Sequence, residues 1–287
     1  MLIALTSLKG SPGVTTFTVA LAANWPVALR RLVVECDPAG GDLAQRFGLA
    51  PSPGLLSLAA AARHPAGSDV VWNHTQMLGG ELPVVAGPAG GPQARAALGT
   101  LVAAGSPLYR AAREPGVLMF ADCGRMDLGS PAESLIRQAD VLLLVSGTYC
   151  DELAHLAARL HEFGRAARPS LVLAGRGHPT NEVERELGVP VIARIPHDPA
   201  GARSLTGHDV AGRGRKGGLA HVAVAVARVL AGEAVPRQLG APEHGFGLQV
   251  PGVPAQQLST SGVRVAPAPV LHNGHQHVSV SGKDSSS

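Results

Sequence analysis

The stretch "LKGSPGVTT", residues 8–16, decides the fold, because it joins a short apolar run, "LIALTS" (2–7), to the apolar pattern of a helix. A glycine-rich turn between a strand and a helix can present successive backbone N–H groups to an anion, and the helix N-terminus adds a partial positive charge there. Gly10 and Gly13 would let the backbone approach a phosphate without a Cβ clash. The alternative is an ordinary Gly/Pro turn into a helix.

The same stretch departs twice from the phosphate-binding loop pattern GxxxxGK[ST], at Leu8 and at Val14. Val14 stands at the position of the lysine that grips phosphates. Thr15 is expected to offer its hydroxyl to Mg²⁺, and Thr16 to a phosphate oxygen. Alone, the loop does not define a nucleotide site, so other stretches must support it.

Apolar runs typical of strands alternate along the chain with Ala-rich amphipathic runs. Strands are predicted at 2–6, 31–35, 82–86, 117–121, 141–146, 170–174 and 191–194. Helices are predicted at 14–23, 43–47, 54–63, 93–103, 131–138, 152–163, 181–187 and 218–230. The strands are continuously apolar, as expected when helices cover both faces of a parallel sheet. This alternation predicts an α/β fold, with a doubly wound, mostly parallel sheet flanked by helices.

We expect one domain over residues 1–233, because from about residue 234 the composition changes to Pro, Gly, Ser, Gln and His without periodicity. Residues 234–287 cannot bury enough apolar area to offset their ordering entropy, so they are predicted to form a disordered tail. Within the tail, "HNGHQH" (272–277) is either a metal-binding tract or a solvated polar segment. We favour the solvated segment, because no carboxylate or thiol accompanies the histidines.

Composition narrows the class of protein. The net charge of +3 and the pI near 9.0 give only slight support for contact with nucleic acid. Cys36, Cys123 and Cys150 form no CxxC pair, so we expect reduced thiols rather than a disulfide framework or a metal site. No stretch approaches the roughly 20 apolar residues that span a bilayer. These observations predict a cytoplasmic protein.

Two further strands end in acidic residues. "LVVECDPAGGDLAQRFG" (32–48) carries Glu35 and Asp37 at the end of an apolar run, and "VLMFADCGRM" (117–126) carries Asp122. Ligands of open α/β sheets bind at the carboxyl ends of the strands, so the glycine loop, Asp37 and Asp122 are expected to converge. An anion cradle beside two carboxylates fits a divalent cation held between them. The alternative for each aspartate alone is a helix cap or turn residue.

With these motifs in place, the chain resembles the MinD/ParA family of deviant P-loop ATPases, whose loop reads KGGxGKTT with an extra lysine before the usual one. Lys9 of "KGSPGVTT" (9–16) stands at that extra position. "ECDPAGGD" (35–42) resembles the second acidic motif of the family, and "FADCGR" (120–125) resembles its Walker B strand end. The segments 139–160 and 187–199 resemble later elements. The resemblance covers about residues 1–232.

The resemblance implies Mg²⁺ with ATP or ADP as cofactors, and a role for each site residue. The phosphate cradle would comprise Lys9, Gly10, Ser11, Gly13, Val14, Thr15 and Thr16. Thr15, Asp37 and Asp122 would surround the metal, with Asp122 acting through water and Asp37 orienting the attacking water. Lys9 would act on the phosphates of a partner subunit in a homodimer that sandwiches two nucleotides. Pro196 and Asp198 would lie near the adenine.

Two departures from the family pattern limit this comparison. A charge-assisted bond to phosphate contributes about 1.5–3 kcal/mol, so Val14 in place of lysine would weaken binding roughly 10- to 100-fold. Hydrolysis would suffer more, by on the order of 100-fold or more, because the lysine stabilises charge that develops in the transition state. Ala174 and Gly175 stand where the family often has a base-reading asparagine, which leaves base selectivity open.

The sequence therefore predicts a nucleotide-dependent switch that positions or partitions intracellular cargo, binding Mg-ATP with slow or absent hydrolysis. The alternative is a pseudo-ATPase scaffold that needs no nucleotide, and whether the chain is an enzyme stays open. Basic residues at 203–216 are either a solvated loop, which we favour, or a contact for non-specific DNA; they are Arg203, Arg213, Arg215 and Lys216. The final "HVSVSGKDSSS" (277–287) has no apolar face, so no membrane anchor of the MinD type is expected.

Overall fold

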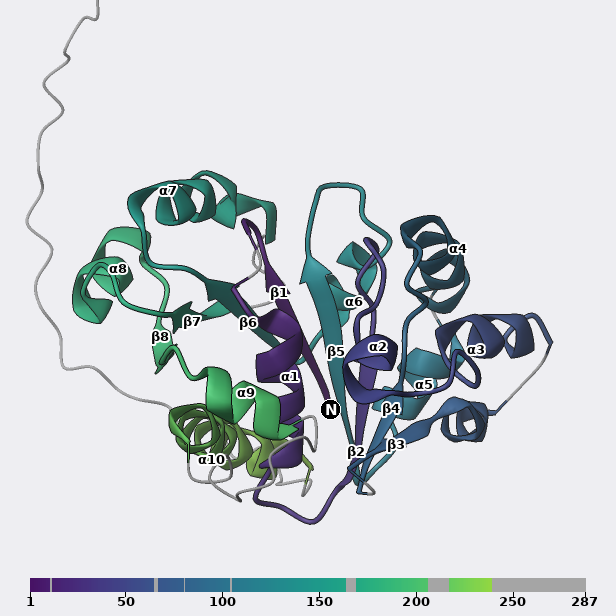
Figure 1. The fold of residues 1–287 in the computed structure, drawn as a ribbon. Helices are drawn as coiled ribbons and strands as arrows, with labels where there is room; N and C mark the ends of the chain where they lie inside the picture. The colour runs from purple at the N-terminus through teal and green to yellow at the C-terminus, as the bar shows by residue number, and fades with distance from the viewer. Residues whose placement is uncertain are drawn as a thin grey trace, which may run out of the picture. The chain divides into compact units, whose positions relative to one another are not determined.

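A computed structural model describes residues 1–10, 12–64, 67–79, 81–103, 105–163, 169–205 and 217–238. Within these ranges the strands form one sheet in the order β3-β4-β2-β5-β1-β6-β7-β8 (Figure 1). The strands are β1 Leu2–Ser7, β2 Arg30–Glu35, β3 Gln76–Leu78, β4 Leu82–Val85, β5 Val117–Arg125, β6 Val141–Ser146, β7 Pro169–Ala174 and β8 Val191–Ile195. All neighbouring strands pair in parallel except β3 and β4.

Helices follow almost every strand. They are α1 Val14–Ala23, α2 Leu43–Phe47, α3 Leu55–Ala61, α4 Gly91–Leu101, α5 Pro107–Ala112, α6 Glu133–Gln138, α7 Cys150–Arg159, α8 Thr180–Leu187, α9 Pro199–Leu205 and α10 Gly218–Gln238. Two 3₁₀ segments, η1 Ser68–His74 and η2 Leu160–Phe163, complete the described elements. The predicted α/β class, with a mostly parallel sheet flanked by helices, is confirmed.

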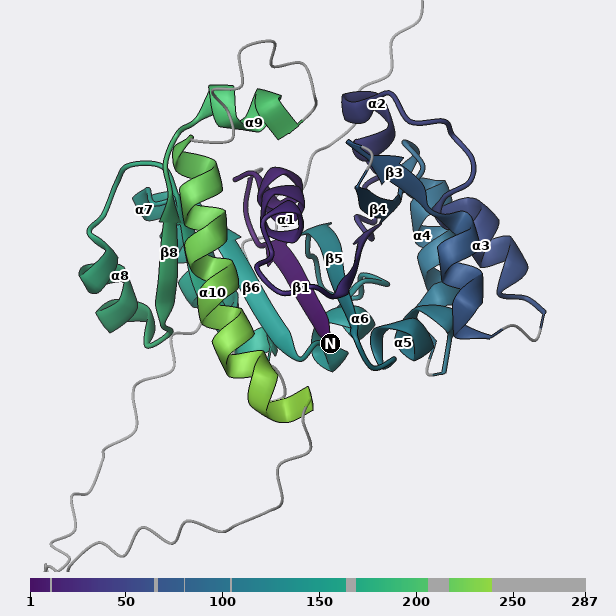
Figure 2. The same cartoon turned by 90° about the horizontal axis from the view of Figure 1, so that it is seen from below.

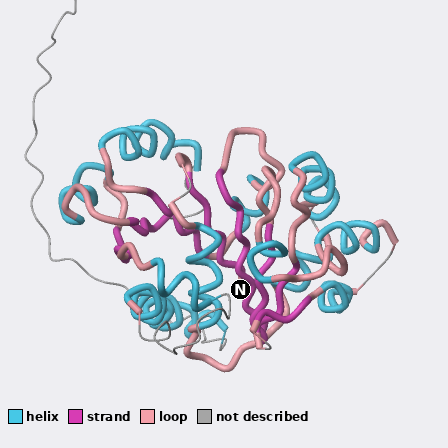
Figure 3. Tube along the Cα trace, in the orientation of Figure 1, coloured by secondary structure: helices cyan, strands magenta, loops and turns pink. Residues whose placement is uncertain are grey.

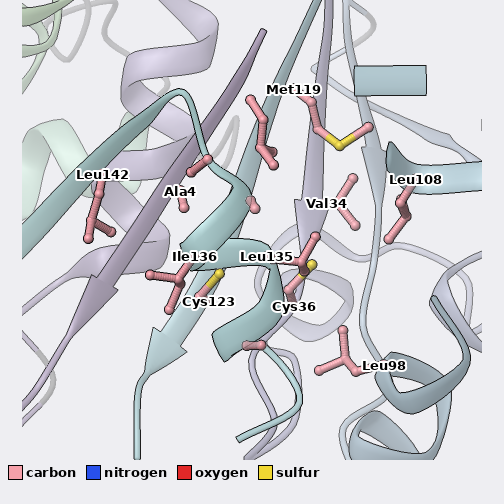
Figure 4. Close-up of a cluster of buried hydrophobic side chains, with 14 of the residues drawn as sticks. Ala4, Val34, Cys36, Leu98, Leu108, Met119, Cys123, Leu135, Ile136 and Leu142 are labelled. Atoms are coloured by element: carbon pink, nitrogen blue, oxygen red, sulfur yellow. The ribbon is translucent and has the colours of Figure 1, made fainter. Parts of the chain in front are cut away.

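Helices cover both faces of the sheet. On one face, α3 to α8 pack on a cluster that includes Leu98, Leu135 and Ile136 (Figure 4). On the other face, α1, α2 and α10 pack on a second cluster that includes Phe17 and Phe120, and α1 lies beside α10 (Figure 2). Burial on both faces is the physical reason why the strands are continuously apolar.

Several elements differ from the prediction. The sequence analysis missed β3, α5, α9 and η1, because runs of three to seven residues are too short to show periodicity. Strand β5 continues to Arg125 rather than ending at Ala121, so Asp122 lies inside the strand, in register with Leu5 and Glu35.

The last helix is also longer than predicted. Helix α10 runs to Gln238 instead of Leu230, and the domain boundary expected at residue 233 therefore falls inside it. Of the disordered tail expected over residues 234–287, residues 239–287, which include its histidines and its C-terminal end, lie outside the described residues. No helix among the described residues is long and apolar enough to cross a membrane.

Candidate functional site

The carboxyl ends of β1, β2 and β5 surround a cavity of about 610 Å³. Its walls come from the glycine turn and the start of α1, the loop after β2, helices α2 and α4, and the loop after β5. Figure 3 shows these loops beyond the strand ends. Five of the predicted site residues line it: Gly10, Gly13, Val14, Thr15 and Asp37. The sheet order produces this convergence, because β1, β5 and β2 are adjacent.

The glycine turn owes its shape to two left-handed residues. Gly10 has φ 68° and Gly13 has φ 97°, a region that L side chains rarely adopt. No heavy atom lies within 4 Å of a Cβ built at either position, so backbone conformation, and not crowding, requires glycine here. Gly13 caps α1 without a side-chain hydrogen bond to the helix end. The first amides of α1 are therefore available to an anion in the cavity.

The remaining residues of the turn differ in their placement. Lys9 is exposed and is not among the described residues that line the cavity. Val14 is 5% exposed and its side chain packs into the core beneath α1. Thr16 does not line the cavity either; its Oγ1 accepts a hydrogen bond of 3.3 Å from Arg46. Ser11 lies outside the described residues.

Asp122 lies in β5, two residues before Gly124, and is not itself among the described residues that line the cavity. Its side chain is fully buried, and Oδ1 accepts a hydrogen bond of 3.2 Å from the Gly124 amide. Oδ2 has no hydrogen-bond partner among the described residues. Burial raises the pKa of Asp122 to about 6, against the opposing effect of the Thr15 hydroxyl and the Gly124 amide. An unpartnered buried carboxylate oxygen is costly, and a nearby cation would offset that cost.

Asp37 projects from the loop after β2. Its Oδ1 accepts a hydrogen bond of 2.7 Å from the Ala39 amide, and partial burial raises its pKa. Its Oδ2 lies so close to Gly124 that a Cβ there would overlap the carboxylate. Gly124 also has φ 54°, so both contact and conformation require glycine at this point of β5. Asp37 therefore lies against Gly124, two residues after Asp122 in β5.

Glu35, the other acidic residue of this motif, holds the loop instead of facing the cavity. Its Oε1 accepts hydrogen bonds from the amides of Asp42 (2.6 Å) and Leu43 (3.0 Å), and its Oε2 accepts one from Gly87 (2.8 Å). Burial, together with the charge of Asp122, raises the pKa of Glu35 to about 7. A Cβ on Gly41 would overlap the same carboxylate. Glu35 thus fixes the start of α2 beside the cavity.

The two residues expected near adenine lie elsewhere in the described structure. Asp198 accepts hydrogen bonds from the Gly201 amide (2.8 Å) and the Leu219 amide (3.0 Å), which lower its pKa. It therefore caps α9 and the start of α10. Pro196 packs beside Gly218. Neither Pro196 nor Asp198 is among the described residues that line the cavity, so their contact with a base stays a prediction.

Sequence reasoning missed the basic residues of the cavity. Arg46 from α2, Arg95 from α4 and Arg125 from the end of β5 line it, with Asp127 beside Arg125. Arg46 belongs to the quoted stretch 32–48, but no motif marks it, and Arg95 lies in a segment predicted only as a helix. Only the packing of the three segments shows that their side chains share one cavity.

One arginine outside the cavity ties its walls together. Arg159 at the end of α7 donates to the Leu8 carbonyl (3.3 Å) and the Met126 carbonyl (3.1 Å), and it pairs with Glu162 at 2.9 Å. The glycine turn and the loop after β5 are therefore anchored to the same guanidinium.

The other residues named from the sequence are placed as follows. Cys36, Cys123 and Cys150 are free thiols in the structure. Arg203 lies in α9, whereas Arg213, Arg215 and Lys216 lie outside the described residues. Within the part that the structure describes, no group of three or more His, Cys, Asp or Glu side chains is arranged to hold a metal ion.

Solved structures share this fold. A ParA family ATPase from Chlorobium tepidum is 19% identical, covering 79% of this chain and 98% of its own, with a TM-score of 0.64. The cell division ATPase MinD of Pyrococcus furiosus is 22% identical, covering 81% and 98%, with a TM-score of 0.62. The septum site-determining protein MinD of Pyrococcus horikoshii, complexed with Mg-ADP, is 18% identical, covering 84% and 99%, with a TM-score of 0.58. No protein-family model and no curated protein sequence matches the chain. The chain thus has the fold of the ParA and MinD ATPases.

The cavity suits a magnesium nucleotide. Its volume lies within the roughly 300–1,000 Å³ of small-molecule sites. The α1 amides and three guanidinium groups provide donors for phosphate oxygens. The buried Asp122 carboxylate lies beside Thr15, whose hydroxyl is an oxygen ligand of the kind Mg²⁺ prefers. Mg²⁺ usually keeps several waters and takes further ligands from substrate phosphates, so few protein ligands suffice.

Proposed function

We propose that the chain binds Mg-ATP and Mg-ADP in this cavity and acts as a MinD/ParA-like switch that positions or partitions intracellular cargo. The observation that carries the proposal is the meeting of a glycine turn and Asp37 in one cavity, with the buried Asp122 carboxylate beside Thr15 and its Oδ2 unpartnered. The structural neighbours named MinD and ParA, one of them complexed with Mg-ADP, support this choice.

Each predicted residue has a role under this proposal. The amides of the glycine turn would bind phosphate oxygens, Thr15 would ligate Mg²⁺, and Asp122 would hold it through water. Asp37 would orient the attacking water. When bound, Mg²⁺ supplies charge neutralisation at the phosphates. Because Val14 supplies no ammonium group, turnover is expected to be slow or absent.

A homodimer in the nucleotide-bound state follows from the resemblance. Lys9 is exposed and outside the cavity of its own subunit, which supports a role toward the phosphates of a partner subunit. Ser11 and Thr16 would complete the phosphate cradle, while Pro196 and Asp198 would flank the adenine. Non-specific DNA contact through the basic residues at 203–216 stays a subsidiary prediction, and plain duplex DNA should retard the protein at low salt only.

Titration with a fluorescent ATP analogue in the presence of Mg²⁺ tests the proposal. We expect saturable binding that chelation of Mg²⁺ weakens and that Asp122→Asn abolishes, while the exposed control Glu186→Gln binds as the unaltered chain does. Absence of binding at millimolar nucleotide would refute the proposal.

The second candidate function is a pseudo-ATPase scaffold, which the buried Val14 favours. The two candidates differ in ligand-linked stability. A nucleotide that binds only the folded chain raises the melting temperature, by an amount equivalent to about 2.7 kcal/mol at 100 times the dissociation constant. An unchanged melting temperature with Mg-ATP would favour the scaffold.

A further inference from the structure

We infer that the guanidinium of Arg46 takes the place of the missing lysine at position 14 and binds the phosphates of the nucleotide. The inference rests on the proposed function, because it assigns the cation of the same site. It starts from the position of Arg46 beside Thr16, in the first turn of α1, with Nη1 3.3 Å from Oγ1. Val14 and Thr16 belong to the same helical turn of α1. The positive charge next to this turn therefore comes from the guanidinium of Arg46 on α2, and not from a residue of α1 itself.

The location of α2 is fixed by buried hydrogen bonds. The Glu35 carboxylate accepts hydrogen bonds from the backbone amides of Asp42 and Leu43, at the start of this helix. Glu35 is 1% exposed and is the last residue of β2. The backbone of α2, and with it the Cα atom of Arg46, is therefore held at a constant position relative to the sheet and to the glycine turn.

The guanidinium itself is free to turn toward a ligand. Its partner Asp42 lies four residues earlier at 2.9 Å, and the two side chains are 44% and 60% exposed. Exposed pairs of this kind contribute little to stability, so a phosphate competes easily for the arginine. The Arg46 charge also acts inside the site, since it opposes the rise in the pKa of the buried Asp122.

Arg46 fits the role better than the other two arginines of the cavity. Arg95 donates to the Pro38 carbonyl at 3.0 Å and thereby supports the loop after β2. Arg125 pairs with Asp127 at 3.4 Å, and its charge lowers the pKa of Asp37 instead of that of Asp122. Among these three arginines, Arg46 is the one whose hydrogen bond to α1 the described structure shows. An arginine fork can bind two phosphate oxygens at once, whereas a lysine acts as a point charge.

The test compares nucleotide affinity in matched variants of the full chain, using a fluorescent ATP analogue with Mg²⁺. Arg46→Ala is expected to weaken binding roughly 10- to 100-fold, the effect of losing one charge-assisted phosphate contact. Arg185→Ala, which removes an exposed arginine on α8, is expected to bind like the unaltered chain. Thermal melting of Arg46→Ala should stay close to that of the unaltered chain, because the lost ion pair is exposed.

Rescue gives the decisive arm. Val14→Lys restores the usual lysine, so in the Arg46→Ala background it should recover at least tenfold of the lost affinity, since one cation replaces the other. The inference is overturned if the unaltered chain binds Mg-ATP and Arg46→Ala binds within twofold of it. If the unaltered chain binds no nucleotide, the proposed function itself fails, and that result is distinct from this one.

Discussion

Replacing Asp122 by asparagine should stabilise the nucleotide-free protein while abolishing the proposed binding of Mg-nucleotide. Asp122 is fully buried and its Oδ2 has no partner among the described residues. Its pKa of about 6 in the folded chain lies above the ordinary value of 3.8, so the folded chain disfavours the charged form. The free energy of unfolding therefore has its full value below about pH 4, and it falls as the pH rises through 6. The difference between the two pKa values corresponds to about 3 kcal/mol at pH 8.

Asparagine carries no charge at any of these pH values, and its side-chain oxygen can still accept the hydrogen bond from the Gly124 amide. Removal of the charge also relieves Glu35, whose pKa Asp122 helps to raise, which acts in the same direction. Urea unfolding of both proteins from pH 4 to pH 8, without nucleotide, measures the difference. We expect equal stability near pH 4 and an advantage for Asp122→Asn that grows to about 3 kcal/mol by pH 8. Glu186→Gln, an exposed control, should show no such trend. Parallel curves for Asp122→Asn and the unaltered chain would refute the reasoning.

Four further substitutions test the packing of the fold. Arg159→Ala removes hydrogen bonds to two backbone carbonyls beside the cavity. It should therefore lower the free energy of unfolding by about 1–3 kcal/mol in urea titrations. An unchanged urea midpoint would contradict the anchoring role of Arg159. Gly41→Ala should lower the melting temperature, because its Cβ would overlap the Glu35 carboxylate. Gly99→Ala, in an open position of α4, should instead raise the free energy of unfolding by about 0.5–1 kcal/mol. Calorimetry in which both substitutions shift the melting temperature in the same direction would be incompatible with this account. Phe17→Ala should cost about 3–5 kcal/mol in chemical denaturation, since Phe17 is fully buried between α1 and the sheet, and a loss below 1 kcal/mol would mean that the core is packed differently.

Local sequence patterns sufficed for most of the sheet. Continuous apolar runs identified seven of the strands in the described chain, and the turn at Gly10 and Gly13 placed α1 with its correct bounds. The patterns failed at β3, which has three residues, and at α5, where Pro107 begins a helix of six. Elements this short depend on neighbours for their stability, so their own residues carry little periodic signal.

The same limit applies to the site. The sequence marked Asp37 and Asp122 because each stands at or near the end of an apolar run, and it could not distinguish the role of Glu35, two residues from Asp37. The structure separates them: Glu35 is sequestered by three backbone amides, whereas Asp37 faces the cavity. Burial and hydrogen bonding depend on the loop that folds over the strand, and residue type does not encode that loop.

By itself, the amino-acid sequence determined the parallel sheet, the glycine turn and the two aspartates, because hydrophobic period, turn chemistry and strand ends are local properties. Tertiary structure alone decided that Arg46, Arg95 and Arg125 share the cavity and that Lys9 does not line it. The reason is geometric. The adjacency of β1, β5 and β2 arises from packing over the whole sheet, and that packing brings together side chains from elements far apart in the chain.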